Sequence, residues 1–288
     1  MCITFMYCNH NSPLDSYKLV LASNRDEDFR RETKPLHQWP NRDVIGGQDA
    51  VKGGTWLATS TNGKLGILLN VLGENSRPNG RDRGPLVVKY VEGQKSAEEY
   101  LTDLKKETEE NVFNGFHIVL LELTLQSTNI YHFSNIAPLD SPSTKVTNVT
   151  NKQENKDHVY GFGNSQCTSQ PFQKVIFGKE KFAEIVNKFN RKSESQNLIQ
   201  NILDLMKNKQ SNYPDPEIDR KAEADMDEDY KMRYSRVCVD ISSIFYGTRT
   251  HSIILVDHNN VMDFHEWTLD YETKKWIHTH IRKTLNMA

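Results

Sequence analysis

Cysteine is scarce in this sequence, and long apolar runs are absent. The 288 residues include four cysteines, and none stands in a Cys-x-x-Cys pair or another zinc-binding spacing. No apolar stretch approaches the roughly 18 residues that a membrane-spanning helix needs, and Met1-Cys2-Ile3 lacks the basic start of a secretory signal. We therefore expect reduced thiols and a cytosolic protein that meets organelle membranes only peripherally.

An excess of charge of one sign is also missing. Lysine and arginine number 36 against 38 acidic residues, which gives a formal net charge of −2. This balance argues against a general nucleic-acid binder and against a polybasic membrane clamp.

The sequence shows no metal-binding pattern. Ten histidines are scattered along the chain, and His278 and His280 share a strand face in a weak C-terminal tail. The acidic stretch 215–229 resembles a calcium loop, but Tyr230 stands where such a loop needs glycine. We expect no metal site, and a solvated loop in this stretch.

Strand-like and helix-like segments alternate in pairs. Strands are predicted in the first half at 2–8, 17–24, 54–61 and 65–71, and in the second half at 115–124, 127–133, 158–164, 235–245, 251–257 and 261–269. Helices are predicted from Gly84-Pro85, from the capping box at Ser96, and at about 172–189 and 196–208. Asn62-Gly63 predicts a type I′ hairpin turn.

This order predicts an α+β fold rather than a parallel sheet with crossover helices. We expect a four-layer αββα sandwich, in which two antiparallel sheets stack between two helical layers. One core of this size suits a single domain over 1–288, with surface loops at 141–157 and 210–232.

Cys2 is a candidate nucleophile. Its small side chain permits removal of Met1, which would leave a thiol and a free α-amine on one residue. An α-amine titrates near pH ~8, so it can accept the thiol proton without a separate histidine. The alternative is a small apolar residue that begins a strand.

Five polar residues follow the strand that ends at Ser23: Asn24, Arg25, Asp26, Glu27 and Asp28. Such a run at a strand end is either a solvated turn or a site carried by a loop. Arg25 could hold an anionic group, and Asp26 could orient Arg25 or the α-amine.

Three further places could contribute to a site. Gly53-Gly54-Thr55-Trp56 allows a close backbone approach beside a flat apolar ring, although a structural turn explains it equally. Asn70 and Asn164 end strands and could donate to an oxyanion, or simply end those strands. The segment from Tyr246 to Thr250 offers Arg249 as a second anion clamp, with a β-bulge or a turn as the alternative.

These motifs together resemble the transport and Golgi organisation protein 2 family, also called the NRDE family. The matching elements are Met1-Cys2-Ile3, Ala22-Ser23-Asn24-Arg25-Asp26-Glu27, Gly53-Gly54-Thr55-Trp56-Leu57, Asn70, Arg83-Gly84, Asn114-Gly115-Phe116, Leu203-Asp204, Pro214-Asp215-Pro216, Tyr246-Gly247-Thr248-Arg249-Thr250 and Ile253-Ile254-Leu255-Val256-Asp257. They follow one another in order over nearly the whole chain.

The resemblance implies an N-terminal-nucleophile αββα fold and a role in intracellular haem trafficking, with cytosolic and mitochondrial members. It also implies links to lipid homeostasis and acyl-CoA. The family is similar to cysteine amidohydrolases, which implies acyl transfer through a thioester on Cys2. In those enzymes an Arg-x-x-Asp order follows the nucleophile, and Arg25 and Asp28 reproduce it.

Two functions therefore compete. A haem carrier would place Trp56 against the macrocycle and Arg25 or Arg249 against the propionates, and would pass haem to apo-proteins from mitochondria or lysosome-like organelles. The sequence offers no evident axial histidine. An N-terminal cysteine hydrolase would instead hold an anionic acyl substrate such as acyl-CoA with the same arginines. Residue chemistry favours the hydrolase, whereas the resemblance favours haem trafficking, which we take as the predicted role.

Overall fold

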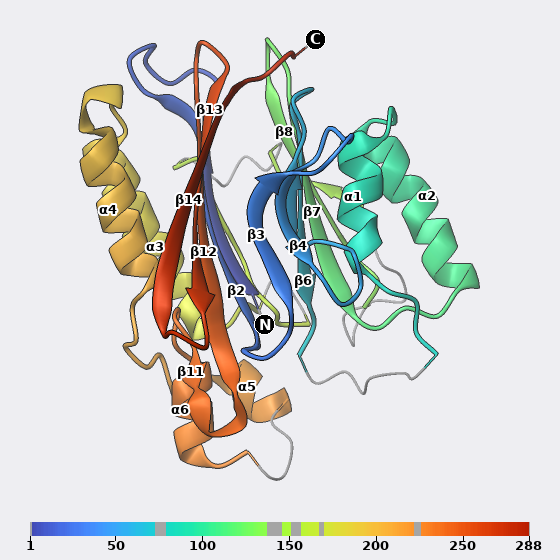
Figure 1. Cartoon of the computed structure of the whole chain (residues 1–288), viewed down its shortest axis with the longest axis vertical. Coiled ribbons are helices and arrows are strands. Elements are labelled where there is room, and N and C mark those ends of the chain that lie inside the picture. The colour runs from blue at the N-terminus through green and yellow to red at the C-terminus, as the bar shows by residue number, and fades with distance from the viewer. Residues whose placement is uncertain are drawn as a thin grey trace. The chain divides into compact units, whose positions relative to one another are not determined.

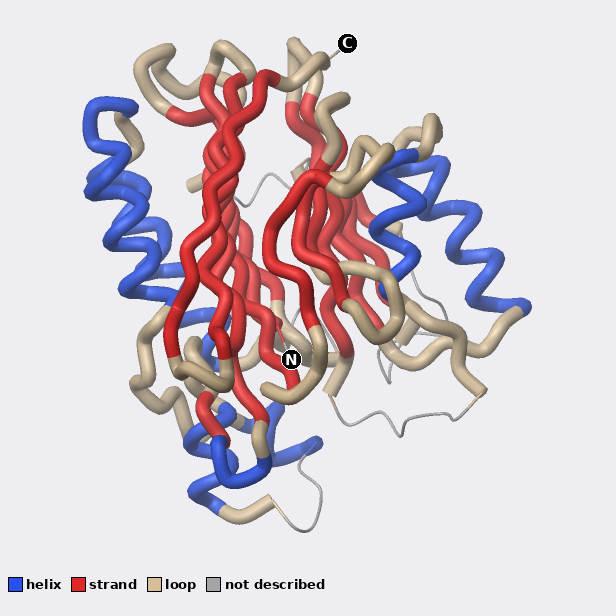
Figure 2. The backbone as a smooth tube through the Cα atoms, in the orientation of Figure 1, coloured by secondary structure: helices blue, strands red, loops and turns tan. Residues whose placement is uncertain are grey.

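The computed structural model describes residues 2–72, 79–136, 146–150, 157–166, 170–221 and 226–287. The chain divides into two compact units, one formed by Met1–Arg31 and Asn155–Lys283, the other by Glu32–Glu154 and Thr284–Ala288. Each unit contains one antiparallel sheet and its own helices, so the predicted α+β class is confirmed (Figures 1 and 2). Among the described residues, no helix has the length and apolar character needed to cross a membrane.

The sheet of the first unit has the order β10-β1-β2-β12-β13-β14, and β11 pairs with β12. Its strands are β1 (Cys2–Cys8), β2 (Tyr17–Asp28), β10 (Val159–Phe162), β11 (Asp240–Ile241), β12 (Tyr246–Asp257), β13 (Val261–Asp270) and β14 (Lys275–Thr284). The two longest central strands, β2 and β12, are almost wholly buried. They provide the rigid scaffold on which the candidate site is built.

Helices cover one face of this sheet (Figure 1). They are α3 (Gln173–Phe189), the 3₁₀ turn η1 (Lys192–Glu194) and α4 (Ser195–Met206), while α5 (Pro216–Lys221), α6 (Glu228–Tyr234) and the 3₁₀ turn η2 (Ser242–Ile244) lie nearer the end of the sheet. The Phe5 ring of β1 packs on Phe182 of α3 at a centroid distance of 6.0 Å. Gly178 allows this approach, because a Cβ there would lie 2.1 Å from the Phe5 ring. We call this face of the sheet the helix face.

The second unit has a sheet of order β3-β4-β5-β6-β7-β8-β9. Its elements are β3 (Thr33–Gln38), β4 (Ile45–Asp49), β5 (Leu57–Thr59), β6 (Lys64–Asn70), β7 (Phe116–Leu123), β8 (Thr128–Ser134), β9 (Thr147–Asn148), α1 (Gly84–Glu92) and α2 (Ala97–Glu110). The predicted capping box is confirmed, since Ser96 and Glu99 satisfy each other's backbone N–H groups. Both helices bury their apolar faces against this sheet.

A β-bulge at Arg249 shifts the pairing register of β12 on β2 by one residue. Thr248 lies opposite Asp26, and His251 lies opposite Asn24. In a regular strand Thr248 and His251 would point to opposite faces, because an odd number of positions separates them. The bulge turns both toward the helix face.

The polar run after Ser23 does not form the loop that the sequence predicts. Residues 24–28 continue β2 and are paired in register with β12, and Asn24 and Arg25 are paired with β1 as well. Their backbone N–H and C=O groups therefore form hydrogen bonds within the sheet, and this allows five polar residues to extend the strand. The bulge alternative for the segment from Tyr246 to Thr250 is confirmed.

Other boundaries also differ from the sequence predictions. Part of the loop predicted at 210–232 forms α5 and α6, where the buried Asp215 carboxylate accepts from the N–H groups of Gln173, Glu217 and Ile218. Only Gly63 of the Asn62-Gly63 pair has a positive φ, so the predicted hairpin forms without a type I′ turn. Most of the predicted loop 141–157, and Cys167, lie outside the described residues.

Candidate functional site

Asn24 determines which ring nitrogen of His251 carries the proton, and both residues lie on the helix face. The Asn24 amide nitrogen donates to the carbonyls of Met206 at 2.8 Å and Val237 at 3.0 Å. Its amide oxygen must therefore face His251 Nδ1, 2.7 Å away, and accept a hydrogen bond from it. The proton of the neutral imidazole then lies on Nδ1, and Nε2 carries a bare lone pair.

His251 is neutral at physiological pH. The side chain is fully buried, and burial lowers its pKa to about 3, with the nearby Lys207 charge acting in the same direction. Trp276 of β14 stacks on the ring at a centroid distance of 4.4 Å. Within the described residues, Nε2 is buried without a hydrogen-bond partner. A buried unpaired acceptor costs stability, so a water molecule, an ion or a ligand is expected to complete this nitrogen.

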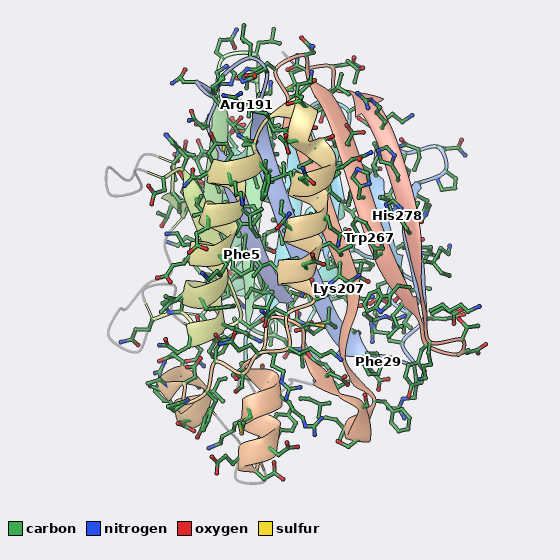
Figure 3. All side chains as sticks on the ribbon, turned by 90° about the vertical axis from the view of Figure 1, so that its left-hand side faces the viewer. Phe5, Phe29, Arg191, Lys207, Trp267 and His278 are labelled. Atoms are coloured by element: carbon green, nitrogen blue, oxygen red, sulfur yellow. The ribbon has the colours of Figure 1, made fainter. Side chains whose placement is uncertain are left out.

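His251 lines a cavity of about 440 Å³ that lies wholly within the first unit. The cavity is bounded by Phe29, Lys207, Lys209, Cys238, Val239, Asp240, Ser242, Thr248, His251, Leu269, Tyr271, Lys274 and Trp276. Figure 3 shows Lys207 and Phe29 near the same end of this sheet. The volume falls within the ~300–1,000 Å³ typical of small-molecule sites, and the wall combines aromatic rings with lysines.

Asp26 is held beside the cavity by Thr248. The Thr248 hydroxyl donates to Asp26 Oδ1 at 2.5 Å and accepts from the Val239 N–H at 2.9 Å. Burial raises the pKa of Asp26 and lowers that of Lys174 to about 8, and each charge acts in part against the shift of the other. Lys174 Nζ donates to the Tyr234 carbonyl at 2.8 Å. Asp26 therefore lies within a buried polar network.

Thr248→Val is expected to destabilise the fold by about 1.5–3 kcal/mol, the usual range for a hydrogen bond to a charged group. Valine keeps the shape but leaves Asp26 Oδ1 and the Val239 N–H without the hydroxyl. Urea unfolding would measure the change, with the surface helix variant Thr102→Val as the matched control. Equal free energies of unfolding for the two variants would contradict this role of Thr248.

Cys2 and Arg25 occupy the opposite face of the sheet. They are register partners on β1 and β2, one position out of phase with Asn24 and Asp26. The Cys2 backbone nitrogen donates to Asn164 Oδ1 at 2.7 Å, and the Asp26 backbone N–H bonds the Cys2 sulfur. Burial raises the pKa of the Cys2 thiol, so the thiol is largely protonated. Removal of Met1 would place a free α-amine where Asn164 now accepts.

The two candidate arginines lie in different surroundings. Arg25 Nη2 is 3.8 Å from Glu27 Oε2, and the same oxygen is 3.8 Å from Arg31 Nε. Arg249 Nη1 donates to the carbonyls of Asp28, at 3.1 Å, and Arg31. Arg249 therefore ties the bulge of β12 to the chain that leaves β2. Beside it the hydroxyl of Tyr246 donates to the Asp26 carbonyl at 3.5 Å.

The remaining candidates lie in the second unit. Gly54 meets Gly84 backbone to backbone, since a Cβ on Gly54 would be 2.5 Å from Gly84 Cα. The Thr55 hydroxyl donates to the carbonyls of Gly47 and Leu57, and Trp56 is buried. Asn70 is exposed at the end of β6. The close approach explains the paired glycines without a ligand.

His251, Lys174 and the lysines of the cavity were not among the residues that the sequence motifs predicted for the site. His251 directly follows the Tyr246–Thr250 motif and precedes an apolar run, so it is a polar residue inside a buried strand. A polar residue at a buried strand position could have marked His251 as a candidate. Its hydrogen-bond partner Asn24 lies far away in the sequence, and only the pairing of β2 with β12 brings the two together.

Comparisons with known proteins agree on a family. A sequence profile described as "Transport and Golgi organisation 2" matches residues 1–271. The Transport and Golgi organization 2 homolog of Mus musculus is 33% identical over 288 residues, covering 96% of each chain. Transport and Golgi organization protein 2 of Drosophila melanogaster is 34% identical over 297 residues, covering 98% of each.

Two solved structures are similar at low identity. One is the Caenorhabditis elegans ortholog of N-acylethanolamine-hydrolyzing acid amidase, with a TM-score of 0.47 and 8% identity, covering 88% of this chain and 92% of that one. The other is a conjugated bile acid hydrolase from Clostridium perfringens, with a TM-score of 0.43 and 7% identity, covering 100% and 98%.

Proposed function

Because the chain belongs to the Transport and Golgi organisation 2 family, as its motifs predicted, we propose that it carries haem in the cavity beside His251. The observation that supports this proposal is the buried Nε2 of His251, whose lone pair has no partner among the described residues. Haem iron is commonly ligated by one neutral imidazole nitrogen. The tautomer fixed by Asn24 supplies that nitrogen.

The rest of the cavity suits a planar dianion. Trp276 and Phe29 offer flat rings for a macrocycle, and Lys207 offers positive charge for a propionate. Tyr271 stacks on Phe29 at a centroid distance of 5.1 Å, and Lys274 Nζ lies over the Tyr271 ring. Lys209 is already paired with Asp240 at 2.9 Å. These residues take the roles that the sequence analysis gave to Trp56, Arg25 and Arg249. We propose apo-haemoproteins as acceptors of the carried haem.

Ligation by His251 is expected to be independent of pH between about pH 8 and 5, because the pKa of its imidazole is about 3. The pKa in the fold lies below the ~6.5 of an unfolded histidine. The stability contributed by neutral His251 is therefore complete above about pH 6.5 and is lost as the pH falls toward about 3.

The Soret band of the haem complex, recorded across this range, provides the measurement. An unchanged band position down to about pH 5 is the expected result. A transition centred near pH ~6.5 would instead assign the iron to an exposed histidine with an ordinary pKa.

A second function is favoured by a different observation, the hydrogen bond from the Cys2 nitrogen to Asn164 Oδ1 at 2.7 Å. After Met1 removal this contact would hold the α-amine beside the thiol. The amine would take the thiol proton as sulfur adds to an acyl carbonyl, then pass it to the departing amine or thiol. Water would hydrolyse the resulting thioester. We propose an anionic acyl substrate for this reaction, with Arg25 as the cation on the Cys2 face of the sheet.

The hydrolase proposal predicts that the mature protein lacks Met1 and that iodoacetamide modifies Cys2 before Cys8, Cys167 and Cys238. The α-amine would assist deprotonation of Cys2, whereas Cys8 and Cys238 are buried, and burial raises the pKa of Cys238 to about 11. Intact-mass and peptide mass spectrometry measure both results. Retention of Met1, or equal modification of all four thiols, would exclude the catalytic role.

A further inference from the structure

We propose that the β13–β14 hairpin contains a binding site for a divalent transition-metal ion, formed by Asp263, His265 and His280. Their ligand atoms all lie within 4.8 Å of one another. The site is in the first unit, at the edge of its sheet, and shares no residue with the cavity beside His251.

The hairpin places an unusual row of side chains on one face. The rings of His265 and His280 stack at a centroid distance of 4.1 Å, and Trp267 stacks on His278 at 4.4 Å. Figure 3 shows Trp267 and His278 close together on strands that α3 and α4 leave uncovered. The row is therefore open to ions from solvent.

Hydrogen bonds already join the polar atoms of this row. His280 Nε2 donates to Asp263 Oδ1 at 2.8 Å, and His265 Nδ1 is 3.2 Å from His278 Nε2. In the second pair one nitrogen must accept, so at least one of these imidazoles is neutral. A neutral nitrogen is the form that ligates a metal.

The separations suit capture of one ion after small side-chain rotations. Metal–nitrogen and metal–oxygen bonds of ~2.0–2.2 Å put neighbouring ligand atoms of a tetrahedral site about 3.3 Å apart. The His280–Asp263 pair is already at 2.8 Å, and His280 is exposed enough to rotate. The ion would replace the proton on His280 Nε2, which is released to solvent or moves to Nδ1 of the same ring. Arg282 Nη1 lies 3.6 Å from Asp263 Oδ1 and would have to move aside.

The donor set selects the class of ion. Imidazole nitrogens with one carboxylate favour Zn²⁺, Cu²⁺, Ni²⁺ or Co²⁺, whereas Mg²⁺ and Ca²⁺ require mostly oxygen ligands. His278 is positioned to serve as a fourth ligand or as the hydrogen-bond partner that orients His265. No local motif predicts this site, because its ligands come from two strands that only the hairpin brings together.

Isothermal titration calorimetry of the full-length protein with Zn²⁺ tests the proposal. The wild type is expected to bind one ion at this site, and His280→Ala is expected to weaken that binding by at least about tenfold, the lower bound for losing even an outer-shell partner. His37→Ala, a partly exposed histidine of the second unit, is the matched control and should bind as the wild type does.

Co²⁺ spectra separate this site from thiol ligation. Four-coordinate nitrogen and oxygen ligation gives an intense visible band, which His280→Ala and Asp263→Asn should remove while near-ultraviolet circular dichroism confirms that both variants stay folded. A sulfur-to-cobalt charge-transfer band that survives in His280→Ala would assign the ion to cysteine and overturn the proposal. Absence of saturable binding in the wild type would overturn it as well.

Discussion

Replacement of His251 by glutamine is expected to weaken haem binding about 100-fold, or about 2.7 kcal/mol. Glutamine can still donate to Asn24 Oδ1, so the contact that positions residue 251 is retained. The variant lacks the imidazole Nε2, and the iron loses its protein ligand. Haemin titration followed at the Soret band measures both the affinity and the change in ligation.

His37→Gln is the matched control, because His37 lies in the second unit and its Nδ1 contacts only the Pro35 carbonyl among the interactions described. Thermal unfolding of both variants without haem would show that the fold survives. If His251→Gln and His37→Gln bind haemin equally well, with the wild-type Soret spectrum, the cavity does not ligate the iron.

Replacement of Cys2 by alanine distinguishes the two proposed functions, haem carrier and hydrolase. In a hydrolase the change removes the atom that forms the acyl intermediate, so turnover of acyl-CoA or amide substrates should fall by at least about 10³-fold while substrate binding persists. In a carrier with His251 as ligand, haem transfer to apomyoglobin should be unchanged. The two faces of the sheet predict this independence, because Cys2 and His251 lie on opposite faces.

Cys8→Ala is the control, since Cys8 is a buried thiol at the other end of β1. Wild-type turnover that disappears with Cys2 and persists in Cys8→Ala would establish the hydrolase. Loss of haem transfer in Cys2→Ala, together with loss of a thiolate Soret signature, would move the iron ligand from His251 to Cys2.

Local patterns allowed prediction of the elements that local chemistry determines. The capping box at Ser96 and the hairpin around Gly63 depend on a few neighbouring residues, and both were confirmed. The predicted end of β2 was wrong. A polar run predicts a loop unless neighbouring strands pair with it, and here β12 pairs with the whole run and β1 with its first two residues. Strand β14 was dismissed as a weak tail because most of its side chains are exposed at the sheet edge.

The site was predictable only in part. The motif residues Asn24 and Asp26 were singled out, but as groups that hold a ligand or orient a catalytic amine. In the structure Asn24 sets the tautomer of His251, and Asp26 accepts from Thr248. These roles depend on which residues of β12 lie opposite β2. A pairing register between distant strands leaves no local trace in the sequence.

The bulge at Arg249 lets the chain lose one residue there without a change in the pairing of β12 with β2. A deletion at a regularly paired position of β2 or β12 would turn every following side chain to the wrong face. Deletion of Arg249 would instead join Thr248 directly to Thr250, and the existing partners Asp26 and Arg25 are already consecutive. In evolution or in engineering, this is therefore a position in the core of the sheet where one residue can be lost while His251 keeps its orientation.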